Sequence, residues 1–129
     1  MDPGDALTGF VRAHIHSVND LRIFFACIDH PERWWSPTAL GRELAVAERT
    51  ARVTLERFAR QNLLDIRISD DVRYRFQPGT EQLEALAWAF AAAYRQDPAL
   101  VVQFVAESAG HDSLRDFADA FRIRRNVDR

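Results

Sequence analysis

Two arginines in one stretch of the sequence have a spacing suited to contact with another molecule. Arg49 and Arg52 lie three positions apart near the start of residues 48–61, a stretch with helical periodicity. A guanidinium group offers a planar fork of N–H donors that matches guanine or a phosphate group. On a helix, both side chains lie opposite the apolar face. The pair therefore predicts forked contacts from one helix to base edges.

Four further arginines flank this stretch and are suited to phosphate contacts, which position a protein on a duplex without reading its sequence. They are Arg42, Arg67, Arg73 and Arg75. Between residues 36 and 79 eight arginines meet six acidic residues, a net charge of +2 in a chain of net charge −2. All 17 basic residues are arginine. Coding bias in a GC-rich genome explains this at least as well as a functional need for arginine does.

The same residues allow a different interpretation, in which the arginines form an ordinary solvated helix face. Glu48 and Glu56 share that face and are spaced to pair with neighbouring arginines. Asp70 and Asp71 would meet phosphate unfavourably. Both interpretations stay open on the sequence.

Catalytic chemistry has little support in this sequence. His14 and His16 lack further ligands at metal-binding spacing, and Cys27 and His30 lack an orienting group. The five glycines are scattered, so no phosphate-binding loop forms. We expect no catalytic residues, no metal, no cofactor and no enzymatic activity. Cys27 lies in an apolar run and is expected to be a buried, inert thiol.

The elements that would position the arginines can be read from caps and periodicity. Ser17 and Asp20 indicate a capping box, and the helix that follows should end near Asp29, ahead of Pro31. Ser36-Pro37 opens the next helix. The apolar positions expected to form a small core are Leu21, Phe24, Phe25, Ile28, Leu40, Leu44, Val46, Ala51, Leu55 and Phe58.

Alternating runs at 63–68 and 72–76, joined by Ser69-Asp70-Asp71, predict a β-hairpin of half-buried strands. The order is helix, extended Trp34-Trp35 piece, helix, turn, helix, hairpin. This order predicts a mainly α fold, a winged helix-turn-helix with a two-stranded wing and extra C-terminal helices. The helix at about 48–61 would enter the major groove.

The part after Thr80 is predicted to be helical, with a kink or new start at Asp97-Pro98, a break at 108–112 and a last helix from 113 to 124. Trp88 lies off the main apolar stripe. We expect one domain over 1–129, with a winged-helix core at about 17–78 and a helical extension at about 80–125. The apolar surplus indicates a homodimer, or a protein partner bound through the C-terminal helices.

Several motifs carry a resemblance: Ser17-Val18-Asn19-Asp20-Leu21, Trp34-Trp35-Ser36, the Leu40–Leu44 helix, Tyr74-Arg75-Phe76 and the ending Phe117 to Arg124. From about residue 15 to 127 the chain resembles short, little-characterised bacterial winged-helix proteins. The helix-turn-helix portion is similar to transcription regulators of the multiple-antibiotic-resistance and arsenic-repressor types. That resemblance implies a dimer that binds double-stranded DNA and has its added helices at the interface.

The chain of 129 residues is 47% apolar, enough for a core without disulfides or metals. No uninterrupted apolar run reaches the ~18 residues of a membrane span. The first five residues are expected to be frayed, and they lack the features of a signal peptide. We therefore expect a cytoplasmic DNA-binding transcriptional regulator. The alternative is a protein–protein interaction module on the same scaffold that regulates another bacterial factor.

Overall fold

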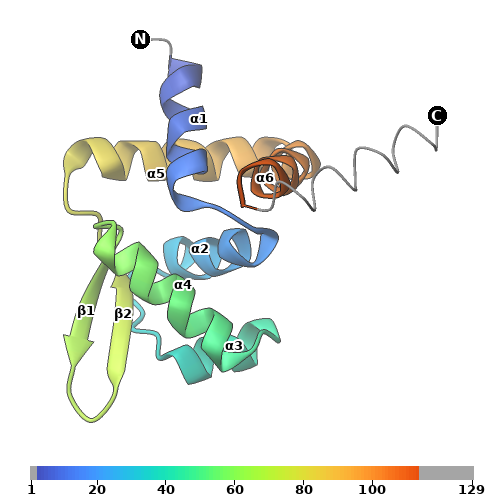
Figure 1. Cartoon of the computed structure of the whole chain (residues 1–129). Coiled ribbons are helices and arrows are strands. Elements are labelled where there is room, and N and C mark those ends of the chain that lie inside the picture. The colour runs from blue at the N-terminus through green and yellow to red at the C-terminus, as the bar shows by residue number, and fades with distance from the viewer. Residues whose placement is uncertain (1–2, 114–129) are drawn as a thin grey trace, which may run out of the picture.

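The computed structural model describes the backbone of residues 3–113 and the side chains of residues 4–107. Six helices and two strands follow one another along this part of the chain (Figure 1). They are α1 (Pro3–His14), α2 (Val18–Asp29), α3 (Pro37–Leu44), α4 (Glu48–Arg60), β1 (Leu64–Ile68), β2 (Val72–Phe76), α5 (Glu81–Gln96) and α6 (Pro98–Ser113).

Hydroxyl side chains begin three of these helices. Ser17 Oγ accepts from the Asp20 amide at 3.0 Å, Ser36 Oγ from the Ala39 amide at 3.1 Å, and Thr80 Oγ1 from the Leu83 amide at 3.1 Å. Each satisfies an amide that has no partner within its helix. The predicted caps at Ser17 and Ser36, and the predicted end of α2 at Asp29, are confirmed. The capping box predicted at Ser17 differs in one bond, because Asp20 accepts from the His16 amide and not from that of Ser17.

Helices α2, α3 and α4 enclose a small core of apolar side chains. Leu40, Leu55 and Phe58 are fully buried, and the ring of Phe24 packs edge-on against that of Phe58 at 6.3 Å. Most of the predicted core positions are buried as expected. Phe25, Leu44 and Val46 are only partly buried, because they lie at the edge of the three-helix unit.

The two strands form an antiparallel hairpin whose register runs from Leu64 opposite Phe76 to Ile68 opposite Val72. Trp35 adds a bridge on the far side of β2, where its amide donates to the Tyr74 carbonyl at 2.7 Å. The predicted hairpin and the extended Trp34-Trp35 piece are confirmed.

The alternation of apolar and polar residues predicted that the first strand would be half buried. This prediction is wrong for the part of the strand beyond the base of the hairpin. Leu64 is buried, whereas Ile66 is 45% exposed and Ile68 is 74% exposed. The hairpin projects past the helices, so no described element covers its outer half (Figure 1).

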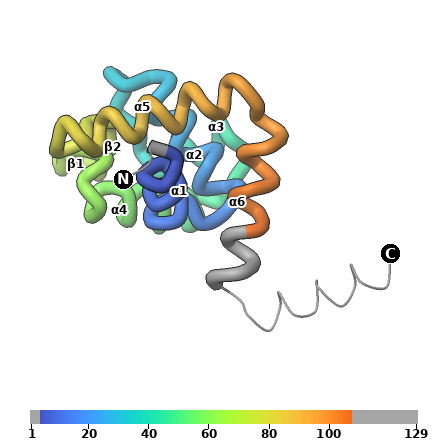
Figure 2. Tube along the Cα trace, turned by 90° about the horizontal axis from the view of Figure 1, so that it is seen from above, coloured from blue at the N-terminus to red at the C-terminus, as the bar shows by residue number. Residues whose placement is uncertain are grey.

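Helices α1, α5 and α6 form a second layer over α2 (Figures 1 and 2). Aromatic rings join the layers: Phe24 of α2 lies 5.5 Å from Phe90 and 6.1 Å from Phe10, measured between ring centroids. Trp88 is 39% exposed, as its place off the stripe predicted, and it touches the base of the wing through Phe76 at 5.8 Å.

Two expectations about helix ends are corrected. The predicted break at 108–112 is helical, because α6 continues to Ser113, and one interior glycine costs only about 1 kcal/mol in a helix. Residues 3–5, expected to be frayed, form the first turn of α1, where proline and an acidic residue are favoured. Asp97 ends α5 and caps α6, accepting from the Leu100 amide at 3.2 Å. The rest of the predicted last helix and the arginine-rich tail lie outside the described residues.

Candidate nucleic-acid interface

The turn between α3 and α4 fixes the angle at which α4 leaves the core. The Val46 amide donates to the Gly41 carbonyl at 2.9 Å, and a Cβ on Gly41 would lie 2.7 Å from the Val46 carbonyl oxygen. Only glycine permits that approach. Ala45 takes the left-handed conformation, with φ 57°, to close the turn.

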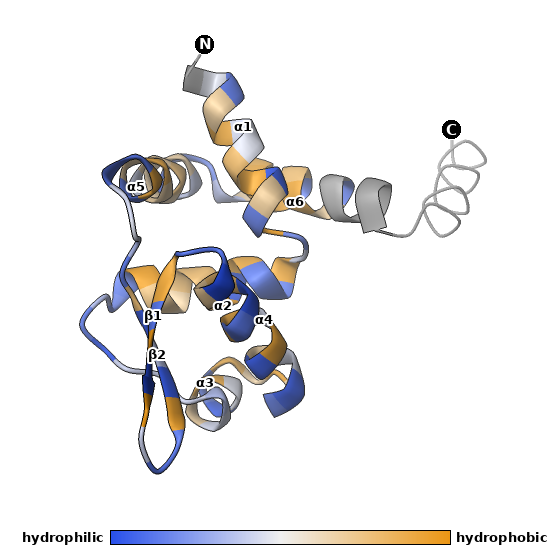
Figure 3. Cartoon of the chain, turned by 60° about the vertical axis from the view of Figure 1, so that its left-hand side comes forward, coloured by the Kyte–Doolittle hydropathy of each residue, from blue (hydrophilic) through white to orange (hydrophobic). Residues whose placement is uncertain are grey.

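Helix α4 has one buried and one exposed face. Ala51, Thr54, Leu55 and Phe58 face the core, and the opposite side carries Arg49, Arg52, Val53, Glu56 and Arg60. Figure 3 shows α4 as largely hydrophilic along its length, and the wing as alternating hydrophilic and hydrophobic bands. The exposed face of α4 is therefore the best candidate to contact a partner.

A buried polar network anchors α4 from behind, and the sequence analysis missed it. Asp20, 4% exposed, accepts from Arg57 at 2.5 Å and from the Thr54 hydroxyl at 2.9 Å. It also accepts from the His16 amide at 2.9 Å. The sequence signal was Asp20 in the capping box, together with Thr54 at a core-facing position of α4. The network joins the recognition-helix candidate to the start of α2.

The three helix-turn-helix arginines predicted to contact DNA differ in their pairing. Arg42 and Arg49 are exposed, and within the described part of the chain neither has an ion-pair or hydrogen-bond partner. Arg52 forms an ion pair with Glu48, whose other oxygen accepts from the Thr38 hydroxyl at 3.0 Å. Arg49 is thus available for contact, whereas Arg52 must first leave Glu48.

The three wing arginines share one face of the hairpin and are engaged with neighbours there. Arg73 Nε donates to both oxygens of Asp71 at 3.1 Å, and Arg75 donates to Gln77 at 2.8 Å. The guanidinium groups of Arg67 and Arg75 lie 4.6 Å and 4.5 Å from the centre of the Trp34 ring. Trp34 is a residue whose role here the sequence did not indicate.

The structure does not bring all six predicted arginines to one surface. Tyr74, on the other face of the wing, packs toward α4: burial raises its pKa, and Glu56 of α4 raises it further. Residues alternate across a strand, so Arg67, Arg73 and Arg75 lie on the wing face turned away from α4. The arginines of the helix-turn-helix and those of the wing therefore lie on separate surfaces and do not form one patch.

Other reactive side chains are used in packing or local hydrogen bonds. Burial raises the pKa of Cys27 to about 12, which keeps it a thiol, as expected for an inert residue. His14 bonds Gln61 at 2.9 Å and His16 bonds the Arg12 carbonyl at 3.1 Å, so the two rings have separate partners. Burial lowers the pKa of His14. Among the residues that the structure describes, no cluster of three or more His, Cys, Asp or Glu side chains could hold a metal.

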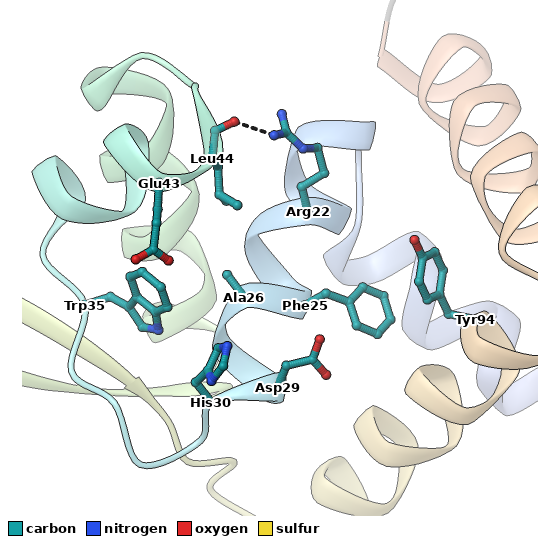
Figure 4. Close-up of a pocket in the computed structure, with 9 residues that line it drawn as sticks. All are labelled: Arg22, Phe25, Ala26, Asp29, His30, Trp35, Glu43, Leu44 and Tyr94. Carbon is teal, nitrogen blue, oxygen red and sulfur yellow. Dashed lines mark hydrogen bonds between the residues drawn. The ribbon is translucent and has the colours of Figure 1, made fainter.

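A hollow of about 340 Å³ lies between α2, α3 and α5 (Figure 4). Its lining combines the aromatic side chains of Phe25, Tyr94 and Trp35 with charged groups. Two of those groups are already engaged: Asp29 pairs with Arg95 at 2.6 Å, and Arg22 donates to the Leu44 carbonyl (Figure 4).

No described helix is both long and apolar enough to cross a membrane.

Comparison with known proteins supports the architecture. No protein-family model and no curated protein matches the sequence. A solved structure of a possible transcriptional regulator from Methanosarcina mazei Go1 is similar, with a TM-score of 0.50 and 13% identity over 74% of this chain and 84% of that one. The chain has a winged-helix core. A MarR family protein of Mycobacterium tuberculosis aligns at a TM-score of 0.46 and 15% identity, over 98% of this chain and 88% of that one.

The comparison and the element order together confirm the predicted fold class, a winged helix-turn-helix with added helices. The predicted resemblance to winged-helix regulators holds for the fold of the core.

Proposed function

We propose that this protein is a DNA-binding transcriptional regulator of the winged helix-turn-helix type, with α4 entering the major groove. The observation that carries the proposal is Arg49, an exposed arginine in the first turn of α4 with no partner among the described residues. The N-terminal residues of such a helix reach base edges. A forked guanidinium at that position is the side chain most often used to read guanine.

Arg42 on α3 supports the same orientation, because the first helix of the motif crosses the phosphate backbone. It is exposed and without a partner in the described part of the chain. Arg52 would also contact the DNA, once its ion pair with Glu48 is broken. Arg67 and Arg73, in the outer half of the wing, would reach flanking phosphates after leaving Trp34 and Asp71. Arg75 bonds Gln77 and lies over Trp34, and it would chiefly support the wing.

The chain would act by binding rather than by catalysis. Its one thiol, Cys27, is buried and protonated, so it offers no accessible nucleophile. A DNA-binding role would place the protein in the cytoplasm of a bacterial cell, with no cofactor.

We also propose that it acts as a homodimer, which would present two α4 helices to a palindromic site. In the helical layer Trp88 is 39% exposed and Leu100 is 61% exposed, and covering them would favour association. Sedimentation of Trp88→Ala should show weaker self-association than the wild type. An unchanged mass would direct attention to a protein partner at the same surface.

The DNA proposal is tested by fluorescence polarisation with a random-sequence duplex at low salt. Arg42→Ala and Arg49→Ala should each weaken binding, because each removes an unpaired cation from the proposed interface. Arg95→Ala is the matched control, since Arg95 is an exposed arginine on α5 that is paired with Asp29. Equal affinities for all four proteins would contradict the placement of α4 in the groove.

A further inference from the structure

Strand β1 is an edge of the wing sheet. Its neighbour on one side is β2, and β2 in turn is bridged to Trp35, so the order across the sheet is Trp35, β2, β1. Within the described residues no strand pairs with the other side of β1, which forms the outer edge of the wing in Figure 1. An exposed edge is a template for pairing with another strand.

The hydrogen bonds of the hairpin show which groups of β1 face outward. The Gln77 amide donates to the Leu63 carbonyl and the Ser69 amide to the Asp71 carbonyl, each at 3.0 Å. Bonded and non-bonded positions alternate along an antiparallel pair, so Leu64, Ile66 and Ile68 direct their N–H and C=O groups away from β2. The Ile66 amide confirms this, because it donates instead to Asp65 Oδ1 at 2.9 Å.

The sequence of β1, Leu64-Asp65-Ile66-Arg67-Ile68, is complementary to itself when reversed. In an antiparallel pair centred on Ile66, the outward groups of Leu64, Ile66 and Ile68 meet outward groups of the second copy. Asp65 then lies opposite Arg67 of that copy, and Arg67 opposite its Asp65. Opposite charges directly across a pair stabilise a sheet, and like charges destabilise it.

The other face of the same strand is apolar, and beyond the buried Leu64 no described element covers it. Ile66 is 45% exposed and Ile68 is 74% exposed. In the register centred on Ile66, Ile66 meets its own counterpart, and Ile68 meets Leu64 of the second copy. Charge, hydrogen bonding and apolar contact therefore select one and the same register.

We propose that β1 pairs with β1 of a second copy of this chain, joining two wings into a continuous antiparallel sheet. The Ile66 amide would bond the Ile66 carbonyl of the other copy. Asp65, which now accepts from that amide and lies 3.9 Å from Arg75 of its own hairpin, would then pair with Arg67 across the interface. The two-fold axis runs perpendicular to the sheet, so both α4 helices lie on the same face of it. Two five-residue strands bury less surface than a permanent interface, so the association is concentration-dependent.

The contact is separate from the one proposed at Trp88. It engages Arg67, which is also proposed to reach phosphate. Tests are therefore made without DNA and in the Trp88→Ala background, which removes the helical contact.

The first test is oxidative cross-linking through a cysteine at the centre of the register. Ile66→Cys should form a disulfide-linked dimer, because each residue 66 faces its own counterpart at a separation that a disulfide spans. Ile68→Cys is the control: it faces residue 64, not itself, and should cross-link poorly although it is the more exposed position. The native Cys27 is buried and does not compete. Equal or stronger cross-linking at residue 68 would overturn the proposed register.

The second test is a charge exchange followed by sedimentation. Asp65→Arg and Arg67→Asp should each weaken self-association by about tenfold, because each places like charges opposite one another twice. The double variant D65R/R67D should restore it. Circular dichroism shows whether each variant keeps the fold. A Trp88→Ala protein that remains monomeric at high concentration, or a double variant no better than the singles, would overturn the proposal.

Discussion

Asp20 is the residue on which the position of α4 depends most. Its buried carboxylate accepts from Arg57, Thr54 and the His16 amide, so three hydrogen-bond donors converge on one group. Removing one partner of a buried ion pair leaves the other charge uncompensated, which costs more than the pair itself contributes.

Asp20→Ala should therefore lower the free energy of unfolding by about 3–5 kcal/mol, measured by urea denaturation. The control is Asp29→Ala, which removes the exposed pair with Arg95 and should change stability by about 1 kcal/mol or less. Similar losses in the two variants would mean that the Asp20 network does not anchor α4.

Ala45 holds the helix-turn-helix turn in a conformation that suits glycine. Its φ of 57° brings the Cβ close to its own carbonyl, a cost of about 1–2 kcal/mol that glycine avoids. Ala45→Gly should raise the melting temperature in a thermal scan, since this relief outweighs the flexibility that glycine adds. Ala89→Gly, at an exposed position in the interior of α5, is the control and should lower it, because glycine costs about 1 kcal/mol within a helix. A decrease in both would show that the turn is not strained at Ala45.

At the scale of the elements, the beginning of α4 combines an attractive and a repulsive group. Glu48 stabilises the helix start and neutralises Arg52, but it would face phosphate in a DNA complex. Glu48→Gln should therefore strengthen duplex binding, by roughly threefold in a polarisation titration. Glu84→Gln, which changes an exposed residue of α5, should leave duplex binding unchanged. Weaker binding by Glu48→Gln would mean that Glu48 itself takes part in recognition.

Caps and periodicity predicted the elements well, because local chemistry decides them. Ser17, Ser36 and Thr80 show where helices begin from neighbouring residues alone. The continuity of α6 was missed because one interior glycine, which costs a helix only about 1 kcal/mol, does not end it. The exposure of Ile68 was missed because alternation reports which face of a strand is apolar, not whether anything covers it.

The candidate site was predicted only in part, for reasons of geometry. The sequence placed Arg49 and Arg52 on one face of α4 and left their pairing with Glu48 or Glu56 open, but it could not show that Glu48 holds Arg52 while Arg49 stays unpaired among the described residues. Nor could it show that Trp34 lies against Arg67 and Arg75, because those three residues meet only through the pairing of separate strands.

At the scale of the whole molecule, the aromatic cluster of Phe24, Phe10 and Phe90 connects the winged-helix core with the helical layer. We propose on this basis that residues 1–129 form a single domain. Thermal unfolding should then be one transition, with circular dichroism and the fluorescence of Trp34 and Trp35 in a Trp88→Phe variant coinciding. Separate midpoints would mean that the core and the helical layer unfold independently.

The salt dependence of duplex affinity decides whether the winged-helix core binds DNA. Each phosphate contact releases counterions, so the logarithm of the binding constant should fall linearly as the logarithm of salt concentration rises. Wild-type protein should bind a random duplex with such a slope, and Arg49→Ala/Arg52→Ala should bind more weakly with a shallower one. Absence of binding by the wild type even at low salt would contradict the account.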